Sequence, residues 1–443
     1  MKNFPERINI ASYRCPFKAN KDKFSELNTG GLVGGLSSLR KNHRINWFCF
    51  DSEEGVDEIT NMTIHRISID REKNKLYYGE FCNNYLWPIF HYLRKADIFR
   101  VEPWLSYRES NIKMVNKISN EIESREIILV NDYHLSLVPE ELNEKGFEKI
   151  SFFWHIPWVS PEYLQMFPWI KEIVSGISGA QKIGFHLPSY KNNFLETYKG
   201  MISQKYSYQT LERRVVAIPL GIDYSEYENV EIRKNKFDEE LKRIKLKGIK
   251  IISSLSRLDY TKGILQKLEA FRHFLVNNPK FHGKVVLVLV VSPSREEVNE
   301  YKWYKESIDK LVGNMNSMLR TPEWTPVIYI YRKITQSEVF SLYRNSDAFL
   351  VTPIMDGLNL VAEEYISSNR NGLLILSKFA GISHYIEATE KVNPFNLEEF
   401  STAIRNILEI SDEIKVDRAS KMREFIRKYD INNWINGMIL KES

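Results

Sequence analysis

The sequence predicts an α/β protein with more than one domain. Its 443 residues suggest two or three domains and leave ample length for buried cores. Short apolar runs such as Ala348–Val351 have the length of buried parallel strands. Polar residues follow two further runs directly, at 131–135 and at His155, and open α/β sheets bind their ligands at such carboxyl ends of strands.

The composition argues against two classes of partner. The chain has 62 basic and 57 acidic residues, and a net charge of +5 is too small to indicate a nucleic acid. The longest aliphatic run, Val285–Val291, is far shorter than a membrane span and suits a buried strand. Residues 1–17 lack the apolar core of a signal peptide.

The cysteines indicate a cellular compartment. Cys15, Cys49 and Cys82 are the only three, and no C-x-x-C pair occurs. Such a sparse, odd set suits a reducing environment and predicts neither a disulfide framework nor a zinc site. We therefore expect a soluble, cytoplasmic protein.

The N-terminal half begins with a strand and a glycine-rich segment. Three apolar runs predict strands at residues 8–11, 127–130 and 151–154. Arg14 follows the first run, and Gly30 and Gly31 stand where a loop enters a helix. Adjacent glycines let a backbone approach a ligand closely, although a tight turn is the simpler explanation. The aromatic stretch 77–92 fits either a ligand site or an aromatic core.

The C-terminal half starts after a charged connection. Residues 224–247 are dense in charge, with a helical stretch at 236–245, and they predict the link between domains. A strand at 249–253 then delivers Arg257 and Lys262, which lie on the two sides of a turn. The arginine can chelate two oxygens and the lysine acts as a point charge, so the pair can grip a diphosphate. Ordinary surface charges are the alternative for two such residues taken alone.

The stretch 347–365 predicts a strand, a polar turn and a helix. Its apolar run ends before Pro353, and Gly357 gives the turn a residue that tolerates positive φ. The N–H groups at the start of the helix favour negative charge. Asp356 can bond hydroxyls ahead of that helix, and Glu364 a further hydroxyl one turn inside it. A sugar, a diphosphate and a ribose suit this geometry, although a plain loop with solvated acids also fits.

Two motifs carry a resemblance to a known family. T-P-x-x-D-G-x-N-L-V-x-x-E-Y at 352–365 and R-L-D-Y-x-K-G at 257–263 resemble the trehalose-6-phosphate synthases, retaining glycosyltransferases of the GT-B class. The resemblance continues in register over about residues 8–440, through H-I-P at 155–157 and P-S-R at 293–295. It implies two Rossmann-like domains facing across a cleft, with a C-terminal helix returning to the first domain.

The resemblance also implies boundaries. The acceptor-side domain is expected at 1–235, the nucleotide-sugar domain at 236–421 and the returning helix at 422–443. The last strand of the first domain is expected at 217–223, and residues 321–335 should hold a loop and an inner strand. Residues 422–440 read as one amphipathic helix bearing Trp434.

Site residues follow from the matched motifs. The implied donor site comprises Gly31, His155, Arg257, Lys262, Asp356, Gly357, Leu358, Asn359, Leu360 and Glu364. The implied acceptor site comprises Arg14, Tyr78, Trp87, Asp132 and Arg295. The catalytic candidates are Asp132, His155, Arg257, Lys262 and Asp356. In these roles Arg14, Tyr78 and Arg295 hold the phosphate of the acceptor, and Arg295 reaches it across the cleft.

The implied reaction moves glucose from UDP-glucose to C1 of glucose 6-phosphate and forms α,α-trehalose 6-phosphate with the donor configuration retained. No cofactor and no metal are expected, because Asp132 and His155 lack a close third ligand and no D-x-D motif occurs. No D-x-D-x-T phosphatase motif occurs either. A separate phosphatase is therefore expected to release trehalose, and a complex with it or a homo-oligomer is an open possibility.

Several positions depart from the family's pattern. Tyr13 and Asn131 replace an asparagine and a histidine, and Phe50 replaces a tryptophan and loses its N–H donor. Met355 and Glu363 each remove a positive charge near an expected anion. These departures leave two alternatives open: a catalytically weak regulatory paralogue that binds sugar phosphate, and a related GT-B enzyme with another acceptor.

Overall fold

A computed structural model describes residues 7–17, 31–93, 98–201, 205–228, 230–231, 233, 235–295 and 299–439. The chain divides into two compact units. Unit 1 consists of Met1–Gly221 and Ile431–Ser443, and unit 2 consists of Ile222–Asp430. The domain bounds expected from the sequence differ from this division, because the helices at Tyr224–Glu228 and Asp412–Lys428 both pack against the helix at Leu360–Ser368, inside unit 2.

Unit 1 is built on an eight-stranded sheet in the order β3-β4-β2-β1-β5-β6-β7-β8. All neighbouring strands are parallel except β3 and β4. The strands are β1 Arg7–Arg14, β2 Arg44–Asp51, β3 Gly55–Ile59, β4 Met62–Ser68, β5 Ile128–Asn131, β6 Ile150–Trp154, β7 Lys182–Phe185 and β8 Val215–Ala217.

The helices of unit 1 include a long π-helix. These helices are α1 Gly31–Ser38, η1 Leu39–Lys41, α2 Arg71–Asn74, the π-helix η2 Lys75–Leu86, α3 Trp87–Phe90, α4 Val101–Glu121, η3 Tyr133–Leu135, α5 Val138–Glu144, α6 Pro161–Leu164, α7 Ile170–Ser178, α8 Pro188–Met201, α9 Tyr208–Arg214 and α18 Ile431–Met438. π-Helical turns occur frequently at functional sites.

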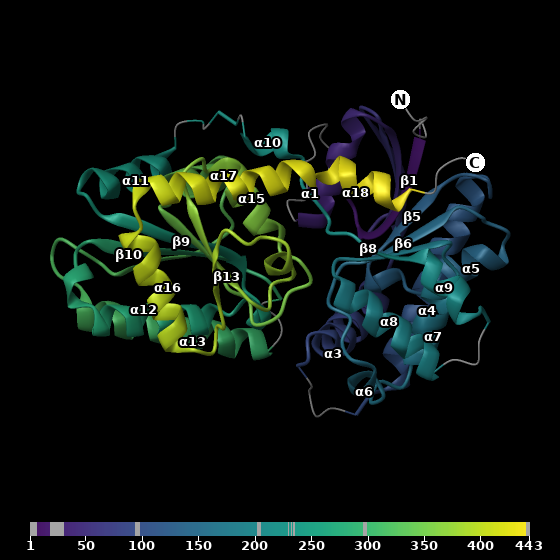
Figure 1. Ribbon diagram of the computed structural model, residues 1–443. Helices are drawn as coiled ribbons and strands as arrows, with labels where there is room; N and C mark the ends of the chain where they lie inside the picture. The colour runs from purple at the N-terminus through teal and green to yellow at the C-terminus, as the bar shows by residue number, and fades with distance from the viewer. Residues whose placement is uncertain are drawn as a thin grey trace. The chain divides into compact units, whose positions relative to one another are not determined.

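Unit 2 contains a six-stranded, fully parallel sheet in the order β11-β10-β9-β12-β13-β14. The strands are β9 Lys250–Arg257, β10 Val285–Ser292, β11 Val327–Tyr331, β12 Ala348–Val351, β13 Leu373–Ser377 and β14 Glu390–Val392. Strand β10 is buried along Val285–Val291 because helices cover both faces of this sheet, with α12 and α13 on one side and α11 and α17 on the other (Figure 1).

The helices of unit 2 connect these strands. They are α10 Tyr224–Glu228, α11 Lys236–Leu246, η4 Tyr260–Lys262, α12 Ile264–Asn277, η5 Pro279–Phe281, α13 Asn299–Leu319, α14 Gln336–Asn345, α15 Leu360–Ser368, η6 Gly381–His384, α16 Leu397–Glu409 and α17 Asp412–Lys428. Crossover helices between parallel strands place the loops after the strands at one edge of the sheet.

Three sequence-based expectations about elements are wrong. Strand β8 ends at Ala217, just before Pro219, so it does not extend over 217–223. Strand β11 lies at the edge of its sheet and is not an inner strand. The expected single helix at 422–440 is two helices, α17 and α18, which separate at residues 429–430 where the chain leaves unit 2.

The C-terminal helix α18 returns to unit 1, as the resemblance implies. It buries Ile431, Trp434, Ile435 and Met438, a spacing of three and four residues that places them on one face. The carbonyl oxygen of Met438 accepts a hydrogen bond from Oγ of Ser151 at 2.7 Å. At Gly184 of β7, a Cβ would lie 2.6 Å from Sδ of Met438, so the helix depends on a glycine there.

The structure contains a disulfide that the cysteine pattern did not predict. Cys15 and Cys49 are bonded, with their Cα atoms 5.1 Å apart, and Cys82 is free and buried. The pairing arises because β1 and β2 are parallel neighbours, so the residue after β1 lies beside the end of β2. The expectation of a chain without disulfides is therefore wrong at this pair.

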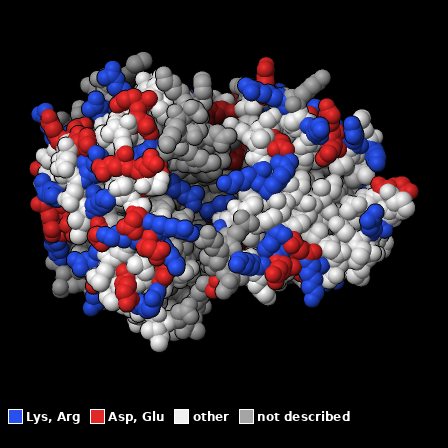
Figure 2. All heavy atoms as spheres, turned by 180° about the vertical axis from the view of Figure 1, so that it is seen from behind, with Lys and Arg blue, Asp and Glu red and all other residues white. Residues whose placement is uncertain are grey.

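Charged residues are mixed on the surface. On the face in Figure 2, acidic and basic side chains lie interspersed over much of the surface. This distribution agrees with the small net charge of +5.

Candidate active site

The donor-side candidates of unit 2 lie at the carboxyl ends of two neighbouring strands. Arg257 is the last residue of β9, and Lys262 ends the short helix η4 that follows. Gly263 has φ 63°, and a Cβ there would meet the carbonyl oxygen of Thr352 at 2.3 Å, so the turn requires glycine. This close approach brings the η4 turn against the chain that leaves β12 toward Asp356.

Lys262 and Asp356 form an ion pair. Nζ of Lys262 lies 2.6 Å from Oδ2 of Asp356, and the two side chains are 15% and 14% exposed. The side-chain amide of Asn359 donates to the same oxygen at 2.8 Å. Arg257, in contrast, forms no side-chain hydrogen bond or ion pair with any residue that the structure describes. Its guanidinium group is therefore available to an anion.

The turn at 356–359 places its positive φ at Asn359 and not at Gly357. Asn359 has φ 92° and is the N-cap residue of α15, but no side chain caps this helix. Asparagine, like glycine, tolerates the left-handed region, so the turn forms without a positive φ at Gly357. Without a side-chain cap, the N–H groups of the first turn, from Leu360 onward, can meet an anion.

Asp259 is a buried acid among the cations of this site. Its buried carboxylate accepts hydrogen bonds from the amide and hydroxyl groups of Thr261, at 3.0 and 2.8 Å. Burial alone would raise the pKa of Asp259, but Arg295, Arg257 and Lys262 together lower it below its usual value. No role for Asp259 was expected from the sequence, although it lies inside the R-L-D-Y motif between two basic residues.

Arg295 is held within unit 2. Its Nη1 lies 3.4 Å from Oδ2 of Asp259 and donates to the hydroxyl of Tyr301, and its guanidinium lies 5.4 Å from the centre of the Tyr301 ring. Arg295 also has a positive φ of 52°. Its expected contact with the acceptor's phosphate stays a prediction.

Lys267 is a basic residue that the motifs did not indicate. It is buried on α12, and its Nζ donates to Oγ of Ser254 at 2.6 Å. Burial, assisted by Lys262, lowers the pKa of Lys267 to about 7.

Two adjacent glutamates of α15 have raised pKa values. Burial raises the pKa of Glu364 to about 7, although the hydroxyl of Tyr343 donates to its Oε2 at 2.8 Å. Burial and the neighbouring Glu364 raise the pKa of Glu363 well above its usual value, although the backbone N–H of Ile222 bonds to it. Glu363 is 2% exposed, so it is not a solvated residue. Its departure from the family's pattern therefore changes a buried position and not the surface charge.

A pH dependence follows from Glu364. Between about pH 4.5 and 7 the unfolded chain releases this proton while the folded chain keeps it, so stability falls as pH rises through this range. Glu364→Gln cannot lose a proton, and its melting temperature relative to the unaltered protein should therefore rise from pH 5 to pH 8. Differential scanning calorimetry at four pH values measures the difference. The same difference at every pH would contradict the raised pKa.

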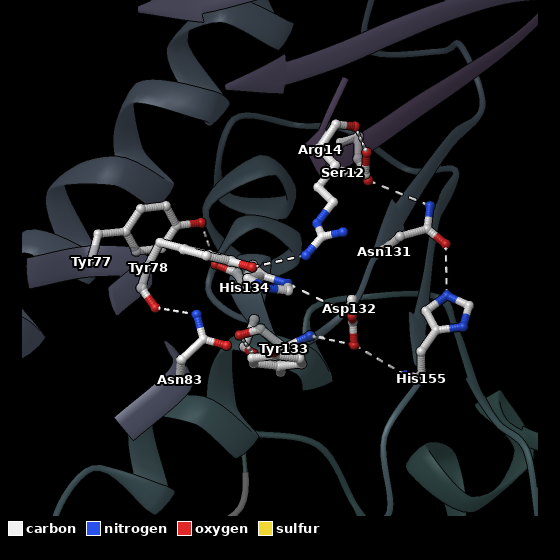
Figure 3. A network of polar contacts seen from close by, with 12 residues as sticks. Ser12, Arg14, Tyr77, Tyr78, Asn83, Asn131, Asp132, Tyr133, His134 and His155 are labelled. Atoms are coloured by element: carbon white, nitrogen blue, oxygen red, sulfur yellow. Dashed lines mark hydrogen bonds and ion pairs between the residues drawn. The ribbon is translucent and has the colours of Figure 1, made fainter. Parts of the chain in front are cut away.

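The acceptor-side candidates of unit 1 form a polar network (Figure 3). Arg14 ends β1, and its Nη2 donates to the hydroxyl of Tyr78 on the π-helix η2 at 2.9 Å. Tyr13 stacks on Tyr78, with ring centres 4.3 Å apart, and its hydroxyl donates to Asn74. The amide of Asn83 donates to the backbone oxygen of Tyr78 at 2.6 Å. Tyr13, which the sequence analysis noted only as a departure from the family's pattern, thus packs against Tyr78, one of the predicted acceptor-binding residues.

Asp132 and His155 follow the neighbouring strands β5 and β6. Asp132 has φ 74°, and its Oδ1 accepts from the N–H groups of Tyr133 and His155 at 3.0 and 3.3 Å. Such backbone strain persists only where surrounding contacts enforce it, and it gathers at functional sites. Burial raises the pKa of Asp132 to about 7, although these two N–H groups and Arg14 act to lower it. This places Arg14, Asp132 and His155 in one electrostatic environment.

Asn131 orients His155 and sets its tautomer. The buried Nδ2 of Asn131 donates to the backbone oxygens of Leu129 and Ala11, at 3.2 and 3.4 Å, so its Oδ1 faces Nε2 of His155 at 3.0 Å. His155 must then carry its proton on Nε2 and leave Nδ1 as an acceptor. Burial, with His186 and His134, lowers the pKa of His155 well below its usual value and keeps the ring neutral.

Asn131→Asp should give the pH profile a new acid limb. A buried carboxylate beside His155 favours the imidazolium form, so kcat/KM for the nucleotide-sugar should fall below about neutral pH, where the unaltered protein keeps a neutral ring. Asn131→His, which restores the family's residue, serves as the control and should keep the original profile. Initial rates from pH 5.5 to 8.5 distinguish the two. Identical profiles for all three proteins would show that Asn131 only fills space.

The remaining predicted residues are placed as follows. Gly31 is the first residue of α1, while Gly30 lies outside the described residues. Trp87 is 7% exposed, with its ring 4.1 Å from that of His91, and this burial favours the aromatic-core alternative. Phe50 is buried against Tyr77. The roles of Gly31 and Trp87 in binding stay predictions.

Within the described ranges, no group of three or more His, Cys, Asp or Glu side chains could hold a metal ion. The polar groups at the carboxyl ends of both sheets are instead cations, carboxylates with perturbed pKa values and a neutral histidine. Two α/β units of this kind define a GT-B glycosyltransferase.

The chain belongs to glycosyltransferase family 20, whose model matches residues 6–441. It is 35% identical to an α,α-trehalose-phosphate synthase (UDP-forming) of Candida albicans, over 97% of this chain and 95% of that protein. Its structure is similar to that of the Escherichia coli trehalose-6-phosphate enzyme bound to UDP-2-fluoroglucose, with a TM-score of 0.88, 27% identity and 97% coverage of both chains.

A second solved structure is similar to the same extent. It is the α,α-trehalose-phosphate synthase of Burkholderia xenovorans in complex with glucose 6-phosphate, with a TM-score of 0.87, 25% identity and coverage of 97% of this chain and 98% of that chain. The family and the GT-B fold expected from the sequence are therefore confirmed.

Proposed function

We propose that the protein transfers glucose from UDP-glucose to glucose 6-phosphate and forms α,α-trehalose 6-phosphate and UDP. The observation that carries this proposal is the basic pair after β9, in which Lys262 is ion-paired to Asp356 and Arg257 is free to bind a diphosphate. Relatives that carry this activity in their names match almost the whole chain, and two of the similar structures hold a UDP-sugar analogue or glucose 6-phosphate.

In the proposed mechanism, cations take up the charge of the leaving group. The bond between glucose C1 and the diphosphate breaks, and negative charge develops on the departing UDP. Arg257, Lys262 and the first-turn N–H groups of α15 stabilise that charge, and preorganised donors of this kind usually supply the largest catalytic contribution. No metal or cofactor is needed in this proposal.

The acceptor loses a proton as the new bond forms. We propose that the hydroxyl on C1 of glucose 6-phosphate attacks from the face that the diphosphate leaves, and that the leaving phosphate takes its proton. The donor configuration is then retained. Asp132 contacts acceptor hydroxyls, and neutral His155 accepts from a hydroxyl of the donor glucose through Nδ1.

A nucleotide-release assay tests the function. UDP release from UDP-glucose is measured with glucose 6-phosphate, glucose and fructose 6-phosphate, and the anomeric configuration of the product is determined by NMR. We expect fast UDP release with glucose 6-phosphate and not with the other two acceptors. The product should be α,α-linked. Release with another acceptor would favour the different-acceptor alternative, and binding without turnover would favour the regulatory paralogue.

The proposal extends to the cellular location and the assembly of the protein. None of the described helices is long and apolar enough to cross a membrane. We propose a cytoplasmic location, with a separate phosphatase that consumes the product and with a homo-oligomer or a complex with that phosphatase as the assembly. Disulfides are rare in a reducing compartment, so with this location we expect Cys15 and Cys49 to be reduced in the cell.

A further inference from the structure

A hollow lies within unit 2, and none of its lining residues is a donor-site candidate. Its volume is about 390 Å³, within the range of small-molecule sites. Helices α10, α15 and α17 form its walls, and α15 lies beside both of the others (Figure 1). The lining side chains that can bond an anion are Tyr224, Ser367, Arg370, Ser420, Arg423 and Arg427.

The three arginines of the hollow are not equally engaged. Nη2 of Arg427 lies 2.5 Å from Oε1 of Glu228, and its guanidinium lies 4.7 Å from the ring centre of Tyr224. Arg423 donates one N–H to the backbone oxygen of Arg370. The guanidinium of Arg370 has no hydrogen bond or ion pair with a residue in the described ranges. Arg370 and Arg423 thus retain most of their donors for a ligand.

The charge of the hollow favours an anion. Glu228 is neutralised by Arg427, and Glu424 is the remaining acid of the lining, so the arginines outnumber the acids. Guanidinium groups bond phosphate oxygens in pairs, whereas a carboxylate offers fewer acceptors. Hydroxyl groups of Tyr224, Ser367 and Ser420 can bond the further oxygens of a polar ligand. A phosphate group therefore fits this set better than a neutral molecule.

The position of the hollow in the chain suggests regulation. Helix α10 begins at Tyr224, two residues after the chain enters unit 2, and α17 ends at Lys428, two residues before the chain leaves it. Both connecting segments thus adjoin the hollow. Helix α15 carries Glu364 four residues before Ser368, its last residue. A ligand that joins these helices restrains the segments that hinge motions use.

We propose that this hollow is a regulatory site for a phosphate group, either free or on a small polar metabolite, held by Arg370 and Arg423. The binding rests on the hollow alone, while the regulatory part rests on the proposed function.

Isothermal titration calorimetry with inorganic phosphate tests the binding. The protein is first saturated with UDP and trehalose 6-phosphate, so that the proposed active site is occupied. Saturable binding is expected, and Arg370→Ala or Arg423→Ala should weaken it by roughly ten- to a hundredfold, the scale of one charge-assisted bond. Arg405→Ala, an exposed change of the same charge on α16, is the matched control and should bind as before. Absence of saturable binding in the unaltered protein, or unaltered binding in the two test variants, overturns the site.

Two further experiments identify the natural ligand and test the regulatory effect. A hexose 1-phosphate that binds more tightly than inorganic phosphate identifies a phosphorylated metabolite, and equal affinity identifies free phosphate. In the kinetic arm, phosphate should change the KM for UDP-glucose in the unaltered protein but not in Arg370→Ala. An effect that persists in Arg370→Ala is competition at the active site and overturns the regulatory part. Absence of any glucosyl transfer would instead overturn the proposed function and leave the calorimetric result standing.

Discussion

Arg257→Ala is expected to lower kcat/KM by between about a hundredfold and several thousandfold, which corresponds to a loss of roughly 3–5 kcal/mol of transition-state stabilisation. Its guanidinium forms no hydrogen bond or ion pair with a described residue, and Arg295 and Lys262 also stabilise the buried carboxylate of the neighbouring Asp259. The change therefore removes a ligand of the diphosphate without stranding a buried acid. Initial rates and circular dichroism on the purified variant measure activity and folding.

The matched control for this change is Arg320→Ala, which removes the same charge from an exposed position of unit 2. It should keep normal turnover. Near-normal turnover in folded Arg257→Ala would remove Arg257 from the site. A loss shared by both variants would point to the overall charge of the unit and not to one ligand.

Lys262 calls for a double variant. Lys262→Ala leaves the largely buried Asp356 without its partner, and an uncompensated buried charge destabilises a protein strongly. The double change Lys262→Ala with Asp356→Asn removes that penalty. If Lys262 binds the diphosphate, stability should return while activity stays well below that of the single change Asp356→Asn. Activity equal to that of Asp356→Asn would mean that Lys262 only holds Asp356.

Local patterns predicted the strands well. The run Ala348–Val351 is β12 to the residue, and the run Val285–Val291 is β10 with one residue more. The local sequence is enough to predict each of these strands, because a short aliphatic run between polar ends is typical of a buried strand. The glycine turn and the helix after β12 also lie where the sequence placed them.

Long-range pairings could not be predicted in the same way. The Lys262–Asp356 ion pair joins residues 94 positions apart, and the Cys15–Cys49 disulfide depends on β1 and β2 being neighbours. The hydrogen bond between Asn131 and His155 likewise depends on the pairing of β5 and β6. These contacts depend on the order of the strands in each sheet, and the local hydrophobic periodicity of the sequence does not determine that order.

The departure at Asn131 has a structural role that its identity alone does not reveal. Read alone, the loss of a histidine favoured a weak regulatory paralogue. In the structure its amide satisfies two backbone carbonyls and orients His155. Met355 has no comparable contact that explains its departure.

Arg14→Ala is expected to raise the KM for glucose 6-phosphate by roughly ten- to a hundredfold, because one charge-assisted bond contributes about 1.5–3 kcal/mol. Arg14 holds the Tyr78 hydroxyl at 2.9 Å, and Tyr13 stacks on Tyr78, so a phosphate would meet a positioned arginine and phenol. Activity with plain glucose should barely change, since that acceptor carries no phosphate.

The ratio between the two acceptors decides this prediction, because it does not depend on the fraction of active protein. Tyr78→Phe removes one hydroxyl and should move the ratio in the same direction but less far. Arg108→Ala, an exposed change of the same charge on α4 of unit 1, should leave the ratio unaltered. If Arg14→Ala keeps the preference for glucose 6-phosphate over glucose, the acceptor's phosphate is not bound by this arginine, and the acceptor-side assignment fails at its central residue.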